Sequence, residues 1–120
     1  MPEHSYDPSD IEAVVYDLDG TLVRLDVDWA VVRQKIFDAL GNDDSLTWEW
    51  GILDIADERG KGDEVRDIIN SHECEGARNS ELLPYAERLR DDGVPTAICS
   101  LNCEEACRIA LEKHGLIQHV

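Results

Sequence analysis

Basic residues are scarce in this 120-residue chain. Eleven lysines and arginines stand against 27 aspartates and glutamates, so the formal net charge at pH 7 is -16. The acids are spread along the chain beside apolar helical positions, which is typical of a solvated acidic surface. Such a surface repels nucleic acids and anionic membranes, and we therefore expect neither of them as a partner.

The chain also lacks a long apolar run. No segment reaches the ~18 apolar residues of a membrane-spanning helix. The N-terminus has no basic region followed by an apolar stretch, which a secretory signal would require. We therefore expect a soluble, cytoplasmic protein. Hydrophobic residues still make up 42% of the chain, which is enough for a folded core.

Cysteine pairs with the spacing of a zinc site are absent as well. The four cysteines are Cys74, Cys99, Cys103 and Cys107, and no two of them form a Cys-x-x-Cys pair. Three of them fall on a predicted strand and on the helix after it. We interpret the cysteines as buried, reduced thiols rather than as zinc ligands.

Two short apolar runs predict buried parallel strands. They cover residues 11–16 and 94–99, and each ends at a short polar motif. Apolar residues at three-to-four spacing predict helices over residues 28–40, 46–59, 63–78, 81–91 and 103–114, and a further strand is predicted to begin at residues 116–120.

This order of elements predicts an α/β fold. We expect a Rossmann-like parallel sheet, incomplete within this chain, with an all-helical insert. Residues 1–26 and 81–120 would form the partial core, and residues 27–80 the insert. Three tryptophans are expected to pack the core of the insert, namely Trp29, Trp48 and Trp50.

The string Asp-Leu-Asp-Gly-Thr-Leu directly follows the first predicted strand. Its carboxylates, Asp17 and Asp19, are two residues apart and point the same way in extended chain. Gly20 lets the chain turn sharply, and the Thr21 hydroxyl can hold that turn. Hard oxygen ligands of this kind suit Mg²⁺, which binds through one or two carboxylates together with a substrate phosphate.

A second polar motif, Ser100-Leu101-Asn102, follows the second strand. Ligands of parallel sheets bind at the carboxyl ends of the strands. We therefore expect this motif to meet Asp17 and Asp19 at one edge of the sheet.

Residues 11–22 resemble the first motif, DxDGTL, of the haloacid dehalogenase superfamily in its phosphatase branch. The resemblance implies that Asp17 is a nucleophile that forms an aspartyl-phosphate and that Asp19 is the general acid and base. It implies Mg²⁺ held by the Asp17 carboxylate and the Asp19 backbone carbonyl. Dehalogenases of the superfamily lack an acid at the Asp19 position, so the resemblance favours phosphoryl transfer.

The second motif extends the resemblance. Ser100 matches the serine or threonine with which the superfamily hydrogen-bonds the phosphoryl group, and the stretch before it is similar to phosphoglycolate phosphatase-like members. The backbone amides of Leu101 and Asn102 are further candidate donors. The helical insert lies where these enzymes carry a cap that selects substrate. Three arginines could face a substrate anion, but we expect each to be a surface ion-pair partner: Arg24, Arg33 and Arg78.

The superfamily's third motif, a lysine, and fourth motif, one or two acids, would both follow residues 116–120. Lys113 falls on the helix before that segment and is not assigned the role of the lysine. We expect the chain to be a fragment of a longer hydrolase; a shortened homologue and a sheet completed by a partner chain are the alternatives. An open sheet edge also favours self-association.

The expected function is Mg²⁺-dependent hydrolysis of a small phosphate monoester through an aspartyl-phosphate on Asp17. Two alternatives stay open. One is a non-catalytic module that binds phosphate or magnesium with the first two motifs alone. The other is transfer of the phosphoryl group to an acceptor other than water. The sequence does not identify the ester or the oligomeric state.

The acidic surface yields a first prediction, because we interpret it as adaptation to a salty cytoplasm; an acidic protein without such adaptation is the alternative. At ~1 M salt the Debye length is about 3 Å, so repulsion among surface carboxylates is screened there and persists in dilute buffer. We expect the melting temperature, followed by circular dichroism, to rise between dilute buffer and molar potassium chloride. A melting temperature that does not rise would exclude this adaptation.

Overall fold

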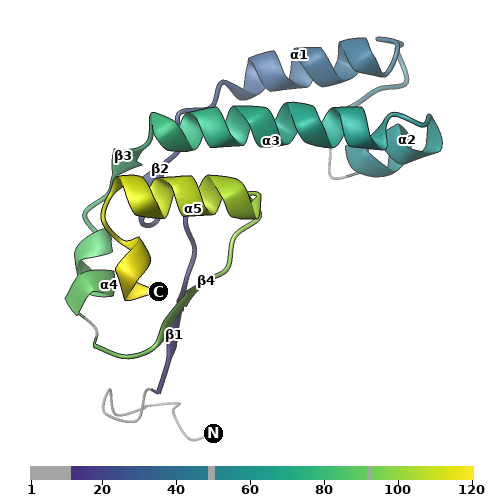
Figure 1. The fold of residues 1–120 in the computed structure, drawn as a ribbon. Helices are drawn as coiled ribbons and strands as arrows, with labels where there is room; N and C mark the ends of the chain where they lie inside the picture. Colours follow the sequence, from purple (N-terminus) through teal and green to yellow (C-terminus); the bar gives the residue numbers. More distant parts are fainter. Residues whose placement is uncertain (1–11, 49–50, 92) are drawn as a thin grey trace, which may run out of the picture.

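The structure is a computed structural model that describes residues 12–48, 51–91 and 93–120 (Figure 1). The elements follow one another as β1 (Val14–Tyr16), β2 (Val23–Arg24), α1 (Trp29–Ala39), α2 (Ile52–Glu58), α3 (Gly62–Arg78), β3 (Glu81–Leu82), α4 (Ala86–Asp91), β4 (Thr96–Ile98), α5 (Glu104–Lys113) and the 3₁₀ helix η2 (Ile117–His119). The chain is thus mixed α/β, as predicted, with five α-helices and a small parallel sheet in its described part.

Two strand pairs organise the fold. β1 and β4 pair in parallel, with Tyr16 opposite Ile98. The ladder continues one step further, because the backbone N–H of Cys99 donates to the Tyr16 carbonyl over 2.9 Å. β2 and β3 form a separate antiparallel pair, with Val23 opposite Leu82. The sequence predicted β1 and β4 but not β2 and β3, since two residues are too few to show an alternating pattern.

Three helix predictions are confirmed closely. They are the predictions for residues 28–40, 63–78 and 103–114, which correspond to α1, α3 and α5. α1 begins after Asp28, whose carboxylate accepts hydrogen bonds from the backbone amides of Ala30 and Val31. Such a cap satisfies amide groups that have no partner within the helix.

Two predicted helices are too long. The helix predicted over residues 46–59 begins only at Ile52. The helix predicted over residues 81–91 begins at Ala86, because the segment before it is extended and pairs as β3. Pro84 explains this difference, since a residue that precedes proline is biased away from helical dihedrals. Leu83 is that residue, and its N–H donates to the Leu22 carbonyl over 2.9 Å.

The strand predicted over residues 116–120 is wrong, because Ile117–His119 form η2. Gly115 has a φ of 69° and reverses the chain at the end of α5. The N–H of Leu116 then donates to the Leu111 carbonyl over 2.8 Å, and the Leu116 side chain is fully buried. In the sequence, an apolar residue that packs against the end of a helix cannot be distinguished from the first residue of a strand.

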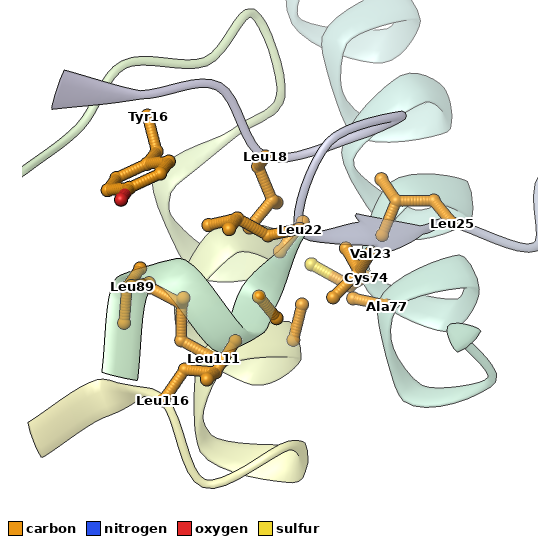
Figure 2. Close-up of a cluster of buried hydrophobic side chains, with 13 residues drawn as sticks. Tyr16, Leu18, Leu22, Val23, Leu25, Cys74, Ala77, Leu89, Leu111 and Leu116 are labelled. Carbon is orange, nitrogen blue, oxygen red and sulfur yellow. The ribbon is translucent and has the colours of Figure 1, made fainter. Parts of the chain in front are cut away.

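Buried apolar side chains form two clusters. The first lies against the parallel sheet (Figure 2) and joins β1, the loop after it, β2, the end of α3, α4 and α5; its members are Tyr16, Leu18, Leu22, Val23, Leu25, Cys74, Ala77, Ala86, Leu89, Ala106, Ala110, Leu111 and Leu116. The second lies within residues 27–80, the predicted insert, and contains Val32, Ile36, Leu40, Leu46, Ile52, Ala56 and Val65. α3 contributes to both clusters and therefore links them.

The tryptophan prediction is wrong for two residues. Trp29 and Trp48 are each 38% exposed and lie outside the second cluster, which is aliphatic. Trp50 lies outside the described residues. Among the helices in the described ranges, none has both the length and the apolarity of a membrane span.

Gly76 generates a stability prediction, because α3 approaches the chain closely there. A Cβ at Gly76 would lie 2.5 Å from Val27 Cγ2 and 3.0 Å from the Asp26 backbone oxygen. We expect Gly76→Ala to lower the free energy of unfolding by about 1–3 kcal/mol, measured by urea denaturation. Gly51→Ala is the control, since its Cβ would meet no atom within 4 Å. Equal midpoints for the two variants would contradict the close approach.

Candidate functional site

Asp17 is the first residue after β1 and is exposed. Its Oδ1 accepts a hydrogen bond from the backbone N–H of Leu18 over 2.8 Å. The Leu18 side chain is fully buried in the first cluster, where Figure 2 shows it beside Leu22. The carboxylate is therefore accessible to solvent and is held by a residue anchored in the core.

The loop after Asp17 closes through its backbone. The Leu18 carbonyl accepts hydrogen bonds from the N–H groups of Thr21, Leu22 and Val23, and the N–H of Gly20 donates to the Val23 carbonyl. Gly20 has a φ of 86°, a left-handed conformation, which confirms the predicted turn. Thr21 joins the turn through its backbone N–H, at 3.2 Å from the Leu18 oxygen, whereas we had expected its hydroxyl to do so.

Asp19 is half-buried and is partly used by the fold. Its Oδ1 accepts a hydrogen bond from the backbone N–H of Leu25 over 3.0 Å. This bond ties the acidic motif to the segment that follows β2. One carboxylate oxygen of Asp19 is therefore engaged by the protein backbone.

The Ser100 motif forms a compact loop between β4 and α5. The Ser100 hydroxyl donates to Asn102 Oδ1 over 2.9 Å and accepts from the Asn102 backbone N–H over 3.1 Å. The backbone N–H of Asn102, a candidate donor to an anion, thus donates to the Ser100 hydroxyl in this structure. Leu101 lies at the tip of the loop and is 86% exposed.

The two motifs meet at one edge of the sheet, as predicted, because β1 and β4 are parallel neighbours in register. One residue of each motif affects the pKa of the Cys107 thiol on α5. Burial raises the pKa of Cys107, a hydrogen bond with Ser100 lowers it, and the negative charge of Asp17 is among the smaller effects that raise it. Asp17 and Ser100 therefore both act on one side chain.

Glu73 on α3 is a site residue that the sequence analysis missed. It is only 4% exposed. Oε2 accepts a hydrogen bond from the Asn102 side-chain amide, and Oε1 accepts one from the Cys103 backbone N–H over 3.1 Å. One signal could have revealed it. Val65, Ile69, Glu73 and Ala77 recur at four-residue spacing, so an acid stands on the apolar stripe of a helix.

The oxygen donors fit Mg²⁺ in kind but are few. The Asp17 carboxylate and the Asp19 backbone carbonyl are hard oxygen ligands, which magnesium prefers. Across residues 12–48, 51–91 and 93–120, no three histidine, cysteine, aspartate or glutamate side chains converge as a metal-binding group. Water and phosphate oxygens would complete the shell of a bound ion, as they often do for Mg²⁺.

The basic side chains that the sequence offered as possible contacts for a substrate anion have partners on the protein. Those partners are Glu81 for Arg24 at 3.3 Å, Glu75 for Arg78 at 3.2 Å and the Trp48 ring for Arg33 at 5.9 Å. The Nζ of Lys113 donates to the Ser80 carbonyl over 2.8 Å. Arg24 and Arg78 are thus surface ion-pair partners, as expected.

The chain matched no protein family, no curated protein and no solved structure with which it was compared. The site must therefore be judged from its own geometry. Two acids follow one strand, a hydroxyl and an amide follow the adjacent parallel strand, and a buried carboxylate supports the second loop.

The four thiols around this edge generate a prediction about reactivity. Cys99 is exposed, whereas Cys74 is buried and burial is the main cause that raises its pKa to about 11. Because the thiolate is the reactive form, we expect iodoacetamide at about pH 8 to modify Cys99 first and Cys74 last. Peptide mass spectrometry of the native protein measures the order.

Cys99→Ser is the matched control and should remove the fastest phase of modification. In urea the difference between Cys99 and Cys74 should disappear. Modification of Cys74 before Cys99 in the native protein would contradict the packing of α3 against α5, where the sulfurs of Cys74 and Cys103 lie 3.9 Å apart.

Proposed function

We propose that this chain carries the nucleophile and the general acid of a magnesium-dependent phosphohydrolase of the haloacid dehalogenase type, which acts on a small phosphate monoester. The observation that supports the proposal most strongly is the placement of Asp17, Asp19 and Ser100 after two adjacent parallel strands. In α/β sheets this edge is the usual position of a ligand. On this proposal β1 and β4 are neighbouring strands of a Rossmann-like sheet.

Asp17 is the proposed nucleophile. A carboxylate oxygen of Asp17 forms a bond to phosphorus while the bond from phosphorus to the ester oxygen breaks. The leaving oxygen takes a proton from Asp19. In the second step Asp19 takes a proton from water, the water oxygen attacks phosphorus, and the Asp17 carboxylate is released together with inorganic phosphate.

The environment of each acid supports this division of roles. Asp17 is exposed and oriented by the Leu18 amide, so an ester can approach it. Asp19 is half-buried, and its hydrogen bond from Leu25 fixes one oxygen. A fixed carboxylate two residues from the nucleophile can serve both proton transfers without a large movement.

Four groups are proposed to hold the phosphoryl oxygens. They are the Ser100 hydroxyl, the backbone amides of Leu101 and Asn102, and Thr21 in the loop after β1. A bound Mg²⁺ would be held by the Asp17 carboxylate and the Asp19 backbone carbonyl and would offset the repulsion between a carboxylate and a phosphate dianion. The insert, which has its own apolar cluster, would act as the cap that selects the ester.

A non-catalytic module that binds phosphate or magnesium is the second candidate. The small number of converging ligands in the described ranges favours it. Both candidates use the same residues to hold phosphate, and only the hydrolase requires Asp17 to form a covalent bond.

Substitution of Asp17 separates the two candidates. We expect the chain to hydrolyse an aryl phosphate in molar potassium chloride only when magnesium is present. Asp17→Asn should lower the rate at least about 10³-fold, because an amide is a poor nucleophile, and Asp19→Asn should lower it by about 10²–10⁴-fold. Release of the aryl alcohol, measured by absorbance, follows the reaction.

Asp26→Asn is the matched control, since Asp26 is an exposed acid close to the motif in sequence, and it should retain the wild-type rate. Equal rates for the wild type and Asp17→Asn would refute the proposed nucleophile. A folded chain that binds inorganic phosphate without turnover would instead support the binding module.

A further inference from the structure

Glu73 is a buried carboxylate whose two oxygens both face donors. They accept from the Asn102 side-chain amide and from the Cys103 N–H. In the described part of the chain no buried side-chain nitrogen or oxygen lacks a hydrogen-bond partner. A carboxylate can remain in such a place only when donors replace water around it. The need of Glu73 for hydrogen-bond donors therefore fixes how the neighbouring polar groups must be oriented.

The constraint passes from Glu73 through Asn102 to Ser100. Because a carboxylate only accepts hydrogen bonds, Asn102 must turn its NH₂ group toward Glu73. Asn102 Oδ1 then faces Ser100 and can only accept, so the Ser100 hydroxyl must donate to it, over 2.9 Å. The Asn102 backbone N–H already donates to the same hydroxyl oxygen. A residue on α3 thus determines where the hydrogen of Ser100 points.

We propose that Glu73 is a positioning residue that acts on Ser100 through Asn102 and commits the Ser100 hydroxyl hydrogen to the protein. This inference rests on the proposed function, in which that hydroxyl donates to a phosphoryl oxygen. An anion at this edge gains the donor only when the bond from Ser100 to Asn102 breaks. A shift of α3 that separates Glu73 from Asn102 would remove the constraint that keeps Asn102 Oδ1 turned toward the Ser100 hydroxyl.

Glu73→Gln tests the proposal, because it preserves size and changes one acceptor into a donor. The new amide oxygen can still accept from Cys103, and its NH₂ group then faces Asn102. Asn102 should turn over and donate to the Ser100 oxygen, which frees the hydroxyl hydrogen. We expect the affinity for inorganic phosphate, measured by calorimetry with magnesium chloride present, to rise about three- to tenfold, the worth of one net hydrogen bond.

Glu104→Gln controls for the loss of negative charge. Glu104 lines the same surface hollow as Ser100 and Asn102 but is exposed and pairs with Arg108 at 2.8 Å. Its substitution removes the same charge without entering the hydrogen-bond chain. We expect the phosphate affinity to change by less than about twofold. A gain in Glu73→Gln no larger than the gain in Glu104→Gln would overturn the proposal.

The double variant Glu73→Gln with Asn102→Asp restores the original direction of the chain. The introduced amide would donate to the introduced carboxylate, which can again accept from the Ser100 hydroxyl. We expect the phosphate affinity to return to the wild-type value or to fall below it. A double variant that keeps the full gain of Glu73→Gln would also overturn the proposal.

A nuclear magnetic resonance measurement tests the positioning role of Glu73 without relying on phosphate binding or turnover. The side-chain amide of Asn102 should exchange with solvent more slowly than that of Asn70, which is exposed on the same helix as Glu73. Equal exchange would overturn the proposal. Absence of turnover in the wild type would count against the hydrolase alone, because slow exchange at Asn102 would still support the positioning role.

Discussion

The parallel pairing of β1 with β4 is the contact on which the site depends. With Tyr16 opposite Ile98, the residues that follow the two strands reach the same edge. A shift of one residue would turn every side chain of a strand to the other face. Two strands alone are marginal, so packing must hold this register. Tyr16 supplies part of it, since its ring is buried and makes an edge contact with the ring of Tyr85 at 6.1 Å.

Helix α3 provides the second constraint. It lies between α1 and α5 (Figure 1) and contributes side chains to both apolar clusters. Near its C-terminus it carries both a close backbone approach, at Gly76, and the buried carboxylate of Glu73. The same turns of helix therefore join the insert to the core and support the Ser100 loop. A change in the position of α3 would therefore also move Glu73, which holds Asn102 and Cys103 beside the Ser100 loop.

Sequence periodicity predicted the long elements because burial repeats along them. α1, α3 and α5 each carry a buried stripe, and the acidic motif stands where a strand meets a glycine with positive φ, at Gly20. The rest depends on distant partners. β2 and β3 are extended because they pair with each other, and Glu73 is tolerated in the core because Asn102 and Cys103 come to it from 29 and 30 residues away. A local pattern cannot contain that information.

The negative charge around the candidate site bears on how a phosphate could bind there, whatever family the chain resembles. Asp17 and Asp19 follow β1, Glu73 stands behind the Ser100 loop, and the whole chain has a net charge of -16. A phosphate dianion that approaches three carboxylates needs compensating positive charge close by. Arg24 and Arg78 bond to acids of the protein, and Lys113 bonds to a backbone carbonyl. On the proposed function, a cation that enters together with the phosphate ester would supply this charge, and the exposed carboxylate of Asp17 is the proposed group to hold it.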